Sequence, residues 1–515
     1  MKDRRMKKRK LRKVRSTKEM EDLISKLPDV LLSSIVSFLP VAEGARTSVL
    51  SRRWETVWKY SSRLNFDQKK MLKPFIQDYI LTSEPTVRLE MSMRRQESSD
   101  YENYFDSIAQ AAMLITSIMD NHIGSLKSCS IRHLVESCAS EDVVGWMRKL
   151  LEKKVTEVSM ELEPFDYCHQ IKNIDLMEAG WNLNIPFEVF SSFKVLKLKN
   201  YTFSTSPFSN SSQVLHTLTL IDMDIKSNNF QEILSHCSSL ENLILGNCDS
   251  LGVDVKIDSS SLKYFKIYDM IVQNLLISSI NVEIIEIDSI ICDDGEIILK
   301  TPKLRVLRAY NDSKKSGHFL SLYENTLLGT RDINKRYCEL GSGGLSMENI
   351  FHNLVTLSLD LDLGNSINSV SLYSSLKSCY RLMSLQINNK VTLGKDNGIY
   401  DQNTNDCMPH GEYMFWPNME PCECINKQLK SVCIKGYKGG RYEYEFVKYL
   451  ITNSQVIENI IICFVDDSLW VEVVATICLL SYPRISPKLS IDLKPGVEYM
   501  KKYGDNFEKW VRTLK

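Results

Sequence analysis

Two cysteine-rich groups in this chain have the residue types of a metal or nucleophile site. Cys407, His410, Cys422 and Cys424 have the residue types of zinc ligands. Structural zinc usually takes two tight pairs with two to four residues between the cysteines, and the Cys-x-x-His and Cys-x-Cys spacings here fit that pattern only loosely. In the adjacent pair Cys168-His169, the two side chains would rarely face each other, and no orienting third group follows. We therefore expect the chain's 14 cysteines to be reduced thiols, mostly buried as small apolar side chains.

A glycine-rich run is the remaining candidate for chemistry. Residues 341–344 read Gly-Ser-Gly-Gly, but the Lys-Ser/Thr step that follows in a phosphate-binding loop is missing. With no convincing nucleophile, metal set or phosphate loop, we expect no catalytic residues, no metal and no cofactor. The chain is therefore predicted to act by binding.

The elements that would do this binding begin near the N-terminus. Between residues 27 and 39, apolar residues recur at steps of three and four, which places them on one stripe of a short helix. Pro28 suits a first helical turn, and Pro40 disfavours continuation of the helix. Two further short stripes follow, the second of which ends at Trp58. Three helices in about forty residues bury little surface, so this segment predicts either a docking module that a partner completes or an ordinary helical mini-core.

This segment, from about residue 23 to 66, closely resembles the plant-type F-box. Residues 27–40 read Leu-Pro-Asp-Val-Leu-Leu-Ser-Ser-Ile-Val-Ser-Phe-Leu-Pro, and residues 47–54 read Thr-Ser-Val-Leu-Ser-Arg-Arg-Trp. The resemblance implies binding to a Skp-type adaptor and, through it, to a cullin-based ubiquitin ligase. The residues that it implies for the adaptor face or its immediate support are Leu27, Pro28, Leu31, Ile35, Phe38, Leu39, Val49, Leu50 and Trp54. Gly44 departs from the pattern, because glycine weakens the short second helix.

Charge is unevenly distributed along the 515 residues. Residues 1–18 hold eleven Lys or Arg and one acid, a net charge of +10, so the remaining chain, with 53 basic and 63 acidic residues, carries −10. The leader lacks the apolar segment of a secretory signal, and no apolar run approaches the ~18 residues of a membrane span. We expect a nuclear or cytoplasmic protein without a membrane partner. Lys7-Lys8-Arg9-Lys10 is a candidate nuclear localisation signal, a solvated disordered leader or, least favoured, a nucleic-acid contact.

The middle of the chain is a repeat of the form apolar, two residues, apolar, one residue, apolar. Its copies begin at Phe193, Leu215, Leu240, Leu262, Val282 and Leu304, with steps of 22, 25, 22, 20 and 22 residues. This is the period of leucine-rich repeats, in which each unit supplies one strand of a stacked solenoid. Looser copies begin at Leu126, Val155, Leu354, Leu382, Leu429 and Ile457. Cys248 stands where its repeat leaves the strand, as in cysteine-containing leucine-rich repeats, and should bond neighbouring backbone inside that turn.

Residues from about 415 to 490 resemble the FBD domain of plant F-box proteins. The matching residues are Leu429-Lys-Ser-Val432, Gly436-Tyr437 and a helix with Phe446, Val447, Leu450 and Ile451 on one side and Glu443, Glu445 and Lys448 outside. The whole chain thus resembles the plant F-box/FBD/leucine-rich-repeat family. We expect an α/β fold: a helical F-box, an irregular leucine-rich-repeat solenoid (horseshoe) and a C-terminal α/β FBD-like unit.

The predicted domains follow from these signals. We expect a disordered basic leader at 1–19, an F-box at 20–66, a linker or helical spacer at 67–125, the solenoid at 126–411, the FBD-like domain at 412–490 and a tail at 491–515. Within the spacer, Ile108, Ala112, Ile115 and Ile118 predict a helix, after a strand at Val87, Leu89 and Met91. Insertions at 310–350 and 388–418 are candidates for substrate contact.

The favoured function is a non-catalytic substrate-recognition subunit of a Skp–cullin–F-box ubiquitin ligase. The F-box would dock the adaptor, and the repeats would hold an unidentified target protein. Two alternatives stay open: a repeat scaffold outside any ligase, and a small-molecule-sensing F-box receptor. A sensor needs a basic pocket on the strand face, where Lys197, Lys199, Lys263 and Lys266 are the few candidate cations.

Overall fold

The fold is known from a computed structural model of the chain. It describes residues 23–72, 99–134, 137, 142–163, 192–203, 214–225, 227–248, 254–272, 274–291, 297–310, 351–364, 366–389, 416–465, 476 and 478–494. The predicted basic leader, the predicted strand at Val87–Met91 and nearly all of both insertions lie outside these residues. In the described part, no helix is both long and apolar enough to cross a membrane.

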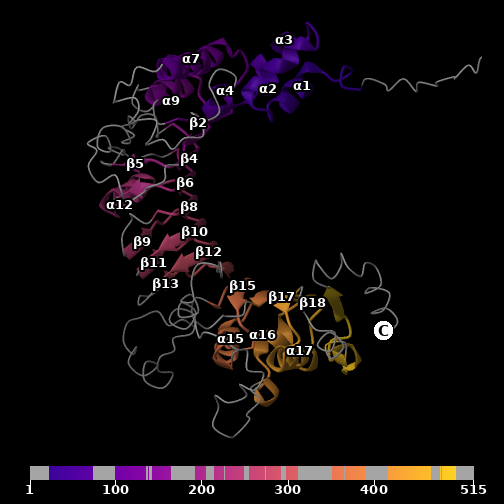
Figure 1. Cartoon of the computed structure of the whole chain (residues 1–515). Coiled ribbons are helices and arrows are strands. Elements are labelled where there is room, and N and C mark those ends of the chain that lie inside the picture. The colour runs from indigo at the N-terminus through magenta and orange to yellow at the C-terminus, as the bar shows by residue number, and fades with distance from the viewer. Residues whose placement is uncertain are drawn as a thin grey trace, which may run out of the picture.

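One long parallel sheet organises the described residues (Figure 1). Each strand pairs with its neighbour in a parallel register, for example Leu243 with Phe265 and Phe265 with Ile285. The strands in spatial order are β1 (Arg63–Asp67), β2 (Ser128–His133), β3 (Glu157–Leu162), β4 (Val195–Lys199), β6 (Thr217–Ile221), β8 (Asn242–Gly246), β10 (Tyr264–Ile271), β12 (Ile284–Ile291), β14 (Val306–Tyr310), β15 (Thr356–Leu361), β16 (Ser384–Asn389), β17 (Ser431–Tyr437), β18 (Asn459–Phe464) and β19 (Ser490–Lys494). The result is the curved solenoid that the repeat predicts.

Helices and two small sheets cover the outer side of this curve (Figure 1). The helices are α4 (Gln68–Leu72), α7 (Ser99–Asn121), α9 (Asp142–Glu152), α12 (Ser227–His236), α15 (Ser366–Ser378), α16 (Glu423–Lys427) and α17 (Arg441–Asn453). Between α12 and α15 the outer layer contains a three-stranded parallel sheet of β9 (Asp254–Asp258), β11 (Asn274–Ser278) and β13 (Ile297–Lys300). A two-stranded sheet joins β5 (Thr202–Phe203) and β7 (Asp224–Ile225). The repeat motif alone did not predict these outer strands.

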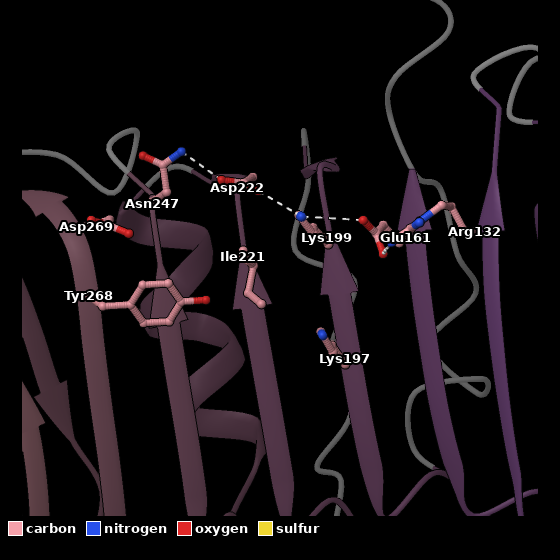
Figure 2. Close-up of a pocket in the computed structure, with 9 residues that line it drawn as sticks. All are labelled: Arg132, Glu161, Lys197, Lys199, Ile221, Asp222, Asn247, Tyr268 and Asp269. Atoms are coloured by element: carbon pink, nitrogen blue, oxygen red, sulfur yellow. Dashed lines mark hydrogen bonds and ion pairs between the residues drawn. The ribbon is translucent and has the colours of Figure 1, made fainter. Parts of the chain in front are cut away.

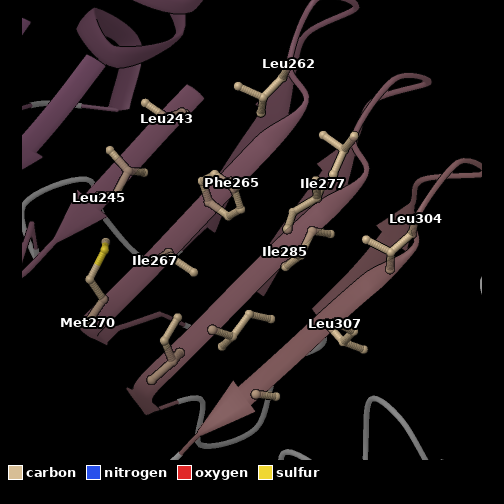
Figure 3. Packing of buried hydrophobic residues seen from close by; sticks show 14 of the residues in the cluster. Leu243, Leu245, Leu262, Phe265, Ile267, Met270, Ile277, Ile285, Leu304 and Leu307 are labelled. Atoms are coloured by element: carbon tan, nitrogen blue, oxygen red, sulfur yellow. The ribbon is translucent and has the colours of Figure 1, made fainter. Parts of the chain in front are cut away.

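The core lies between the two layers and is continuous along the solenoid. Along the inner strands, alternate residues are buried because successive strand side chains point to opposite faces. Leu262, Phe265 and Ile267 of one repeat stack on the equivalent residues of the next, and Ile277 of the outer sheet packs toward them (Figure 3). Every repeat start named from the sequence is a buried residue that stands two positions before its strand. The leucine-rich-repeat interpretation is therefore confirmed.

Cys248 sits in the turn after β8, as predicted. It is fully buried, and its Sγ lies 3.2 Å from the carbonyl oxygen of Gly246 and 3.6 Å from that of Leu220 on the neighbouring strand. The thiol adds to the backbone bonding at this strand end, where the Gly246 carbonyl also accepts from the N–H of Asp222 at 2.8 Å. The thiol thus joins two adjacent repeats.

The FBD region extends the solenoid, since β17, β18 and β19 continue the same parallel sheet. Its helix α17 buries Phe446, Val447, Leu450 and Ile451, as expected. Glu443, however, was predicted to lie outside and is buried. Its carboxylate accepts hydrogen bonds from the backbone N–H groups of Gly440 (2.8 Å) and Lys438 (3.1 Å) and from the amide of Asn389. The side chain therefore caps its own helix and ties it to β16, which explains why it points inward.

Replacing Glu443 should test this cap. Glu443→Ala removes the acceptor of two backbone donors and of the buried Asn389 amide, so we expect a loss of about 1–2 kcal/mol in the free energy of unfolding. Glu443→Gln keeps an acceptor and should lose less.

Burial raises the pKa of Glu443, and this effect exceeds the opposing effect of the hydrogen bonds to its carboxylate. The wild-type chain should thus lose stability relative to Glu443→Gln as pH rises above the ordinary glutamate pKa and through the raised one. Urea unfolding at several pH values measures both effects, and equal stability of all three proteins would contradict the cap.

The predicted starts of the two insertions differ from the structure, because the strands before them are longer than predicted. The insertions were placed from 310 and 388, but Tyr310 is the last residue of β14, and Asn388 lies inside β16. Both residues continue the ladder because their backbone groups pair with the neighbouring strands. The helix predicted between 67 and 125 is present as α7, with Ile108, Ala112 and Ile115 buried.

Candidate functional site

The N-terminal helices present two apolar faces, of which one is buried. They are α1 (Asp29–Val36), α2 (Val41–Arg46), the 3₁₀ turn η1 (Thr47–Val49), α3 (Trp54–Val57) and η2 (Trp58–Tyr60). Leu32 and Val36 of α1 pack against Trp54 and Val57 of α3, with Leu27 and Trp58 at the margin. This small cluster, which we call the F-box core, accounts for only part of the apolar periodicity.

The other apolar face lies open to solvent. Leu31, Ile35 and Phe38 lie on another side of α1 and at its end, and they are 49%, 52% and 73% exposed. Val49 and Leu50, after α2, are 87% and 64% exposed. Large apolar side chains gathered on a surface mark an interaction site. We call these five residues the docking face.

The other four residues implied for the adaptor face have different positions. Pro28 is exposed at the start of α1, and Leu27 and Leu39 are partly buried. Trp54 is buried in the F-box core and so supports the docking face from beneath. The structure thus separates residues that can touch a partner from one that holds the helices together.

Arg53 fixes the segment that leads into α1. Its guanidinium donates to the carboxylate of Asp29 (2.6 Å) and to the carbonyl oxygens of Ser25 (2.7 Å) and Leu27. Three acceptors on one planar group hold Leu27 and Pro28 in place. Sequence reasoning missed this role because these partners are 24–28 residues away. Arg53 is therefore a positioning residue for the docking face.

Close packing accounts for the glycine at position 44, which the sequence had suggested only as a residue that weakens the second helix. It is buried, and a Cβ at this position would lie 3.1 Å from Cγ1 of Val36. The absence of a side chain lets α2 approach α1 closely. A side chain at position 44 would require Val36 to shift by a few tenths of an ångström.

The docking face is joined firmly to the solenoid. β1, directly after η2, pairs with β2 as the first strand of the sheet, and Val41 belongs to the solenoid core. The backbone N–H groups of Ile123 and Gly124 donate to the carbonyl oxygen of Lys59 at 2.9 and 3.0 Å. A Cβ on Gly124 would lie 2.8 Å from Cα of Tyr60, so the two segments are in direct contact. These contacts fix the orientation of the docking face relative to the strands.

The candidate metal and catalytic groups are not assembled in the described structure. Cys422 and Cys424 are buried around the start of the short helix α16. Burial raises the pKa of both thiols, which disfavours the thiolate that zinc needs. Within the described ranges, no three His, Cys, Asp or Glu side chains are placed to hold a metal ion. Cys168, His169, Gly341–Gly344, Cys407 and His410 lie outside those ranges.

Comparison with known families supports each segment separately. Residues 24–66 match the F-box domain, and residues 417–462 match the FBD domain. Residues 143–322 match the leucine-rich repeats of a family described as "FBD-associated F-box protein At5g56370, LRR repeats". The matched segments follow one another in the order docking helices, solenoid and C-terminal extension.

Similar proteins come from Arabidopsis thaliana. The chain is 26% identical to F-box protein At1g80960 over 463 residues, which cover 86% of this chain and 83% of the relative. It is 28% identical to the F-box/FBD/LRR-repeat protein At5g56420 over 251 residues, or 48% of this chain and 49% of the relative. Putative F-box/LRR-repeat protein At3g42770 is 28% identical over 244 residues, which span 46% of this chain and 39% of that protein.

The fold and the docking face therefore define an F-box protein built on a leucine-rich-repeat solenoid. The FBD match at the C-terminal end narrows the assignment. The chain belongs to the plant F-box/FBD/LRR-repeat protein family.

Proposed function

We propose that this protein is a substrate-recognition subunit of a Skp–cullin–F-box ubiquitin ligase. The observation that carries the proposal is the docking face, where five large apolar side chains lie exposed on F-box helices. Such a surface is stabilised when an apolar groove of a partner covers it. The partner that the F-box implies is a Skp-type adaptor, which connects to a cullin.

The attachment of the F-box to the solenoid supports a positioning role. Because β1 is part of the sheet, a target bound to the solenoid would be held in a fixed direction from the adaptor. A ligase of this type accelerates transfer by keeping target lysines near the activated ubiquitin thioester. The chain itself then needs no nucleophile, metal or cofactor. We propose the nucleus or cytoplasm as its site of action because of the basic leader.

Adaptor binding should depend on the docking face and not on exposed apolar residues in general. We expect the full chain to capture a plant Skp-type adaptor and cullin, and the triple variant Ile35→Ala/Phe38→Ala/Val49→Ala to bind the adaptor at least 100-fold more weakly. The wild-type residues are at least half exposed, so unfolding temperatures should change little. Quantitative pull-down and calorimetric titration measure these effects.

The matched control replaces three exposed apolar residues outside the F-box, which are 57–64% exposed. Met113→Ala/Ile271→Ala/Ile280→Ala should bind the adaptor like wild type. Failure of the wild-type chain to bind, or equal weakening by both triple variants, would overturn the proposal. Reconstitution with ubiquitin-activating and ubiquitin-conjugating enzymes separates a ligase subunit from a scaffold, since only the former directs ubiquitin transfer.

A further inference from the structure

A polar hollow of about 480 Å³ lies on the inner, strand-lined face of the solenoid, in its N-terminal half (Figure 2). Its residues come from the outward positions of the inner strands and from the turns at their C-terminal ends. They are Arg132, Glu161, Lys197, Lys199, Ile221, Asp222, Asn247, Tyr268 and Asp269. Neither the docking face nor the F-box core includes any of them.

The carboxylates on the Lys199 side of the hollow are neutralised by neighbouring cations. Glu161 accepts from Arg132 at 3.0 Å and lies 3.4 Å from Lys199, which is also 3.7 Å from Asp222. Burial raises the pKa of Glu161, but the hydrogen bonds and charges of Arg132 and Lys199 outweigh it and hold that pKa below its ordinary value. These residues form an internally satisfied row across β2, β3, β4 and β6 (Figure 2).

Lys197 is different, because none of the described carboxylates lies within ion-pair distance of its ammonium group. It stands on β4 between Ser159 of β3 and Thr219 of β6 in the strand register, and both neighbours are uncharged. Its Nζ turns toward Ile221 on the next strand (Figure 2). The hollow therefore offers one uncompensated positive charge, partly shielded from water.

Tyr268 faces Lys197 from the other side. Its ring lies across Gly246, where a Cβ would come within 2.2 Å of Cζ, so only glycine on β8 leaves space for this orientation. The hydroxyl consequently points over β8 toward Ile221 (Figure 2). Burial and neighbouring acids raise the pKa of Tyr268, so the hydroxyl stays a hydrogen-bond donor. An ammonium group and a hydroxyl thus flank one apolar side chain.

Three residues at the edge of the hollow, which we call the acidic rim, have left-handed backbone conformations. Asp222, Asn247 and Asp269 have φ values of 51°, 48° and 52°, a region that Asn and Asp tolerate better than most residues. The Asn247 side-chain amide donates to the Asp222 carboxylate at 2.7 Å. Asp269 lies beyond Asn247, on the side away from Lys197 (Figure 2). The acidic rim is therefore separated from the uncompensated cation.

The shape of the hollow indicates what it can hold. Its lining runs across six neighbouring strands, β2 to β10 in sheet order. At a strand spacing of about 4.8 Å, five steps give roughly 24 Å. A compact small molecule would fill only part of that length, whereas an extended peptide crossing the strands would follow it. The length thus favours a segment of a protein.

We propose that this hollow binds an extended segment of the target protein through one acidic side chain. The carboxylate contacts Nζ of Lys197 and the hydroxyl of Tyr268, and its methylene stem rests on Ile221. Charge complementarity selects the acid, because the hollow's other cations already contact carboxylates. The inference deepens the proposed function and rests on it, since it assumes that the solenoid holds the target.

Selection from a randomised library of short linear peptides on the purified full chain tests the proposal. We expect one position to become enriched in Asp or Glu over Asn or Gln. For a peptide from the enriched set, changing that Glu to Gln, or Lys197→Ala in the protein, should weaken binding about five- to tenfold in fluorescence anisotropy. Tyr268→Phe should weaken it about two- to fivefold. The pair of Lys197→Glu protein and a Glu-to-Lys peptide should recover part of the lost affinity.

Two further variants make the result specific. Lys194→Ala removes an exposed cation three residues away, outside the hollow, and should leave affinity unchanged. Gly246→Ala should displace the Tyr268 ring and weaken binding without removing any polar group. Selection of peptides without an acidic position, equal binding by Lys197→Ala, or displacement of the peptide by a free small carboxylic acid at equal concentration would overturn the inference. Adaptor capture is measured on the same proteins, so failure of this site is distinguishable from failure of the proposed function.

Discussion

Replacing Trp54 by alanine is expected to unfold the F-box helices while the solenoid stays folded. Trp54 fills the F-box core with Leu32, Val36 and Val57, and these few residues hold α1 and α3 together. Removing a buried tryptophan costs about 3–5 kcal/mol, which a cluster of this size cannot supply. The effect should stay local, because the F-box core is separate from the continuous solenoid core.

Hydrogen exchange and adaptor binding together measure this outcome. In Trp54→Ala, amides of α1 and α3 should lose protection, those of the inner strands should keep it, and adaptor capture should be abolished. Phe38→Ala is the matched control: Phe38 is 73% exposed, so its loss should weaken adaptor binding without altering protection. If Trp54→Ala kept a protected α1, the tryptophan would not be the support that its burial indicates.

The contrast between Trp54 and Phe38 shows what the sequence can predict about the F-box and what it cannot. Both belong to the F-box pattern, and the resemblance placed both in the adaptor face or its support. The distinction depends on how α3 packs against α1, since adjacent α1 residues, about 100° apart around the helix, differ in burial: Leu32 is buried and Leu31 is exposed. Apolar periodicity identifies an apolar helix, but two apolar faces require the packing partner to tell them apart.

The repeat predicts most of the inner sheet and misses its ends. β1 and β19 were not recognised as repeat strands. A serine, Ser61, occupies the first apolar position before β1, and the apolar residues before and within β19 (Leu489, Ile491 and Leu493) recur at steps of two. Pairing with β2 and with β18 builds both strands nonetheless. The outer sheet left a readable signal, the alternating pairs Val255/Ile257 and Leu275/Ile277 between repeats. Tertiary pairing thus extends a periodic pattern beyond its recognisable copies.

The hollow depends on register, which local sequence does not contain. Lys197 and Lys199 were recognised as outward cations, but Arg132 and Tyr268 stand 65 and 71 residues from Lys197. Only the stacking of β2 to β10 brings them onto one surface. Of the other two candidate cations, Lys266 contacts Glu286 at 3.4 Å, and Lys263 precedes its strand and contacts Glu241 at 2.7 Å. Of the four candidate lysines, Lys197 is therefore the one without a carboxylate partner among the described residues.

A second large effect is expected where the first repeats meet. His133, at the end of β2, is buried beside Trp146 and Tyr201, with ring centroids 6.0 and 5.8 Å away. Its Nδ1–H donates to the carbonyl oxygen of Leu134 (2.9 Å), which leaves Nε2 to accept from the Tyr201 hydroxyl. Both ring nitrogens are thus satisfied in the neutral form. Burial lowers the pKa of His133 to about 4, against a smaller opposing contribution from the backbone hydrogen bond.

Acid should therefore destabilise the chain through His133. The unfolded chain binds a proton here below about pH 6.5 and the folded chain only near pH 4, so stability present at neutral pH is lost as pH falls between these values. At about 1.4 kcal/mol per pH unit, the full loss is about 3–4 kcal/mol. Urea unfolding at pH 7 and pH 5 should show His133→Gln less stable than wild type at pH 7, with the gap narrowing by about 2 kcal/mol at pH 5. His216→Gln, which replaces a partly buried histidine outside this aromatic cluster, is the matched control. A gap for His133→Gln that stays constant with pH would show that His133 titrates alike in the folded and unfolded chains.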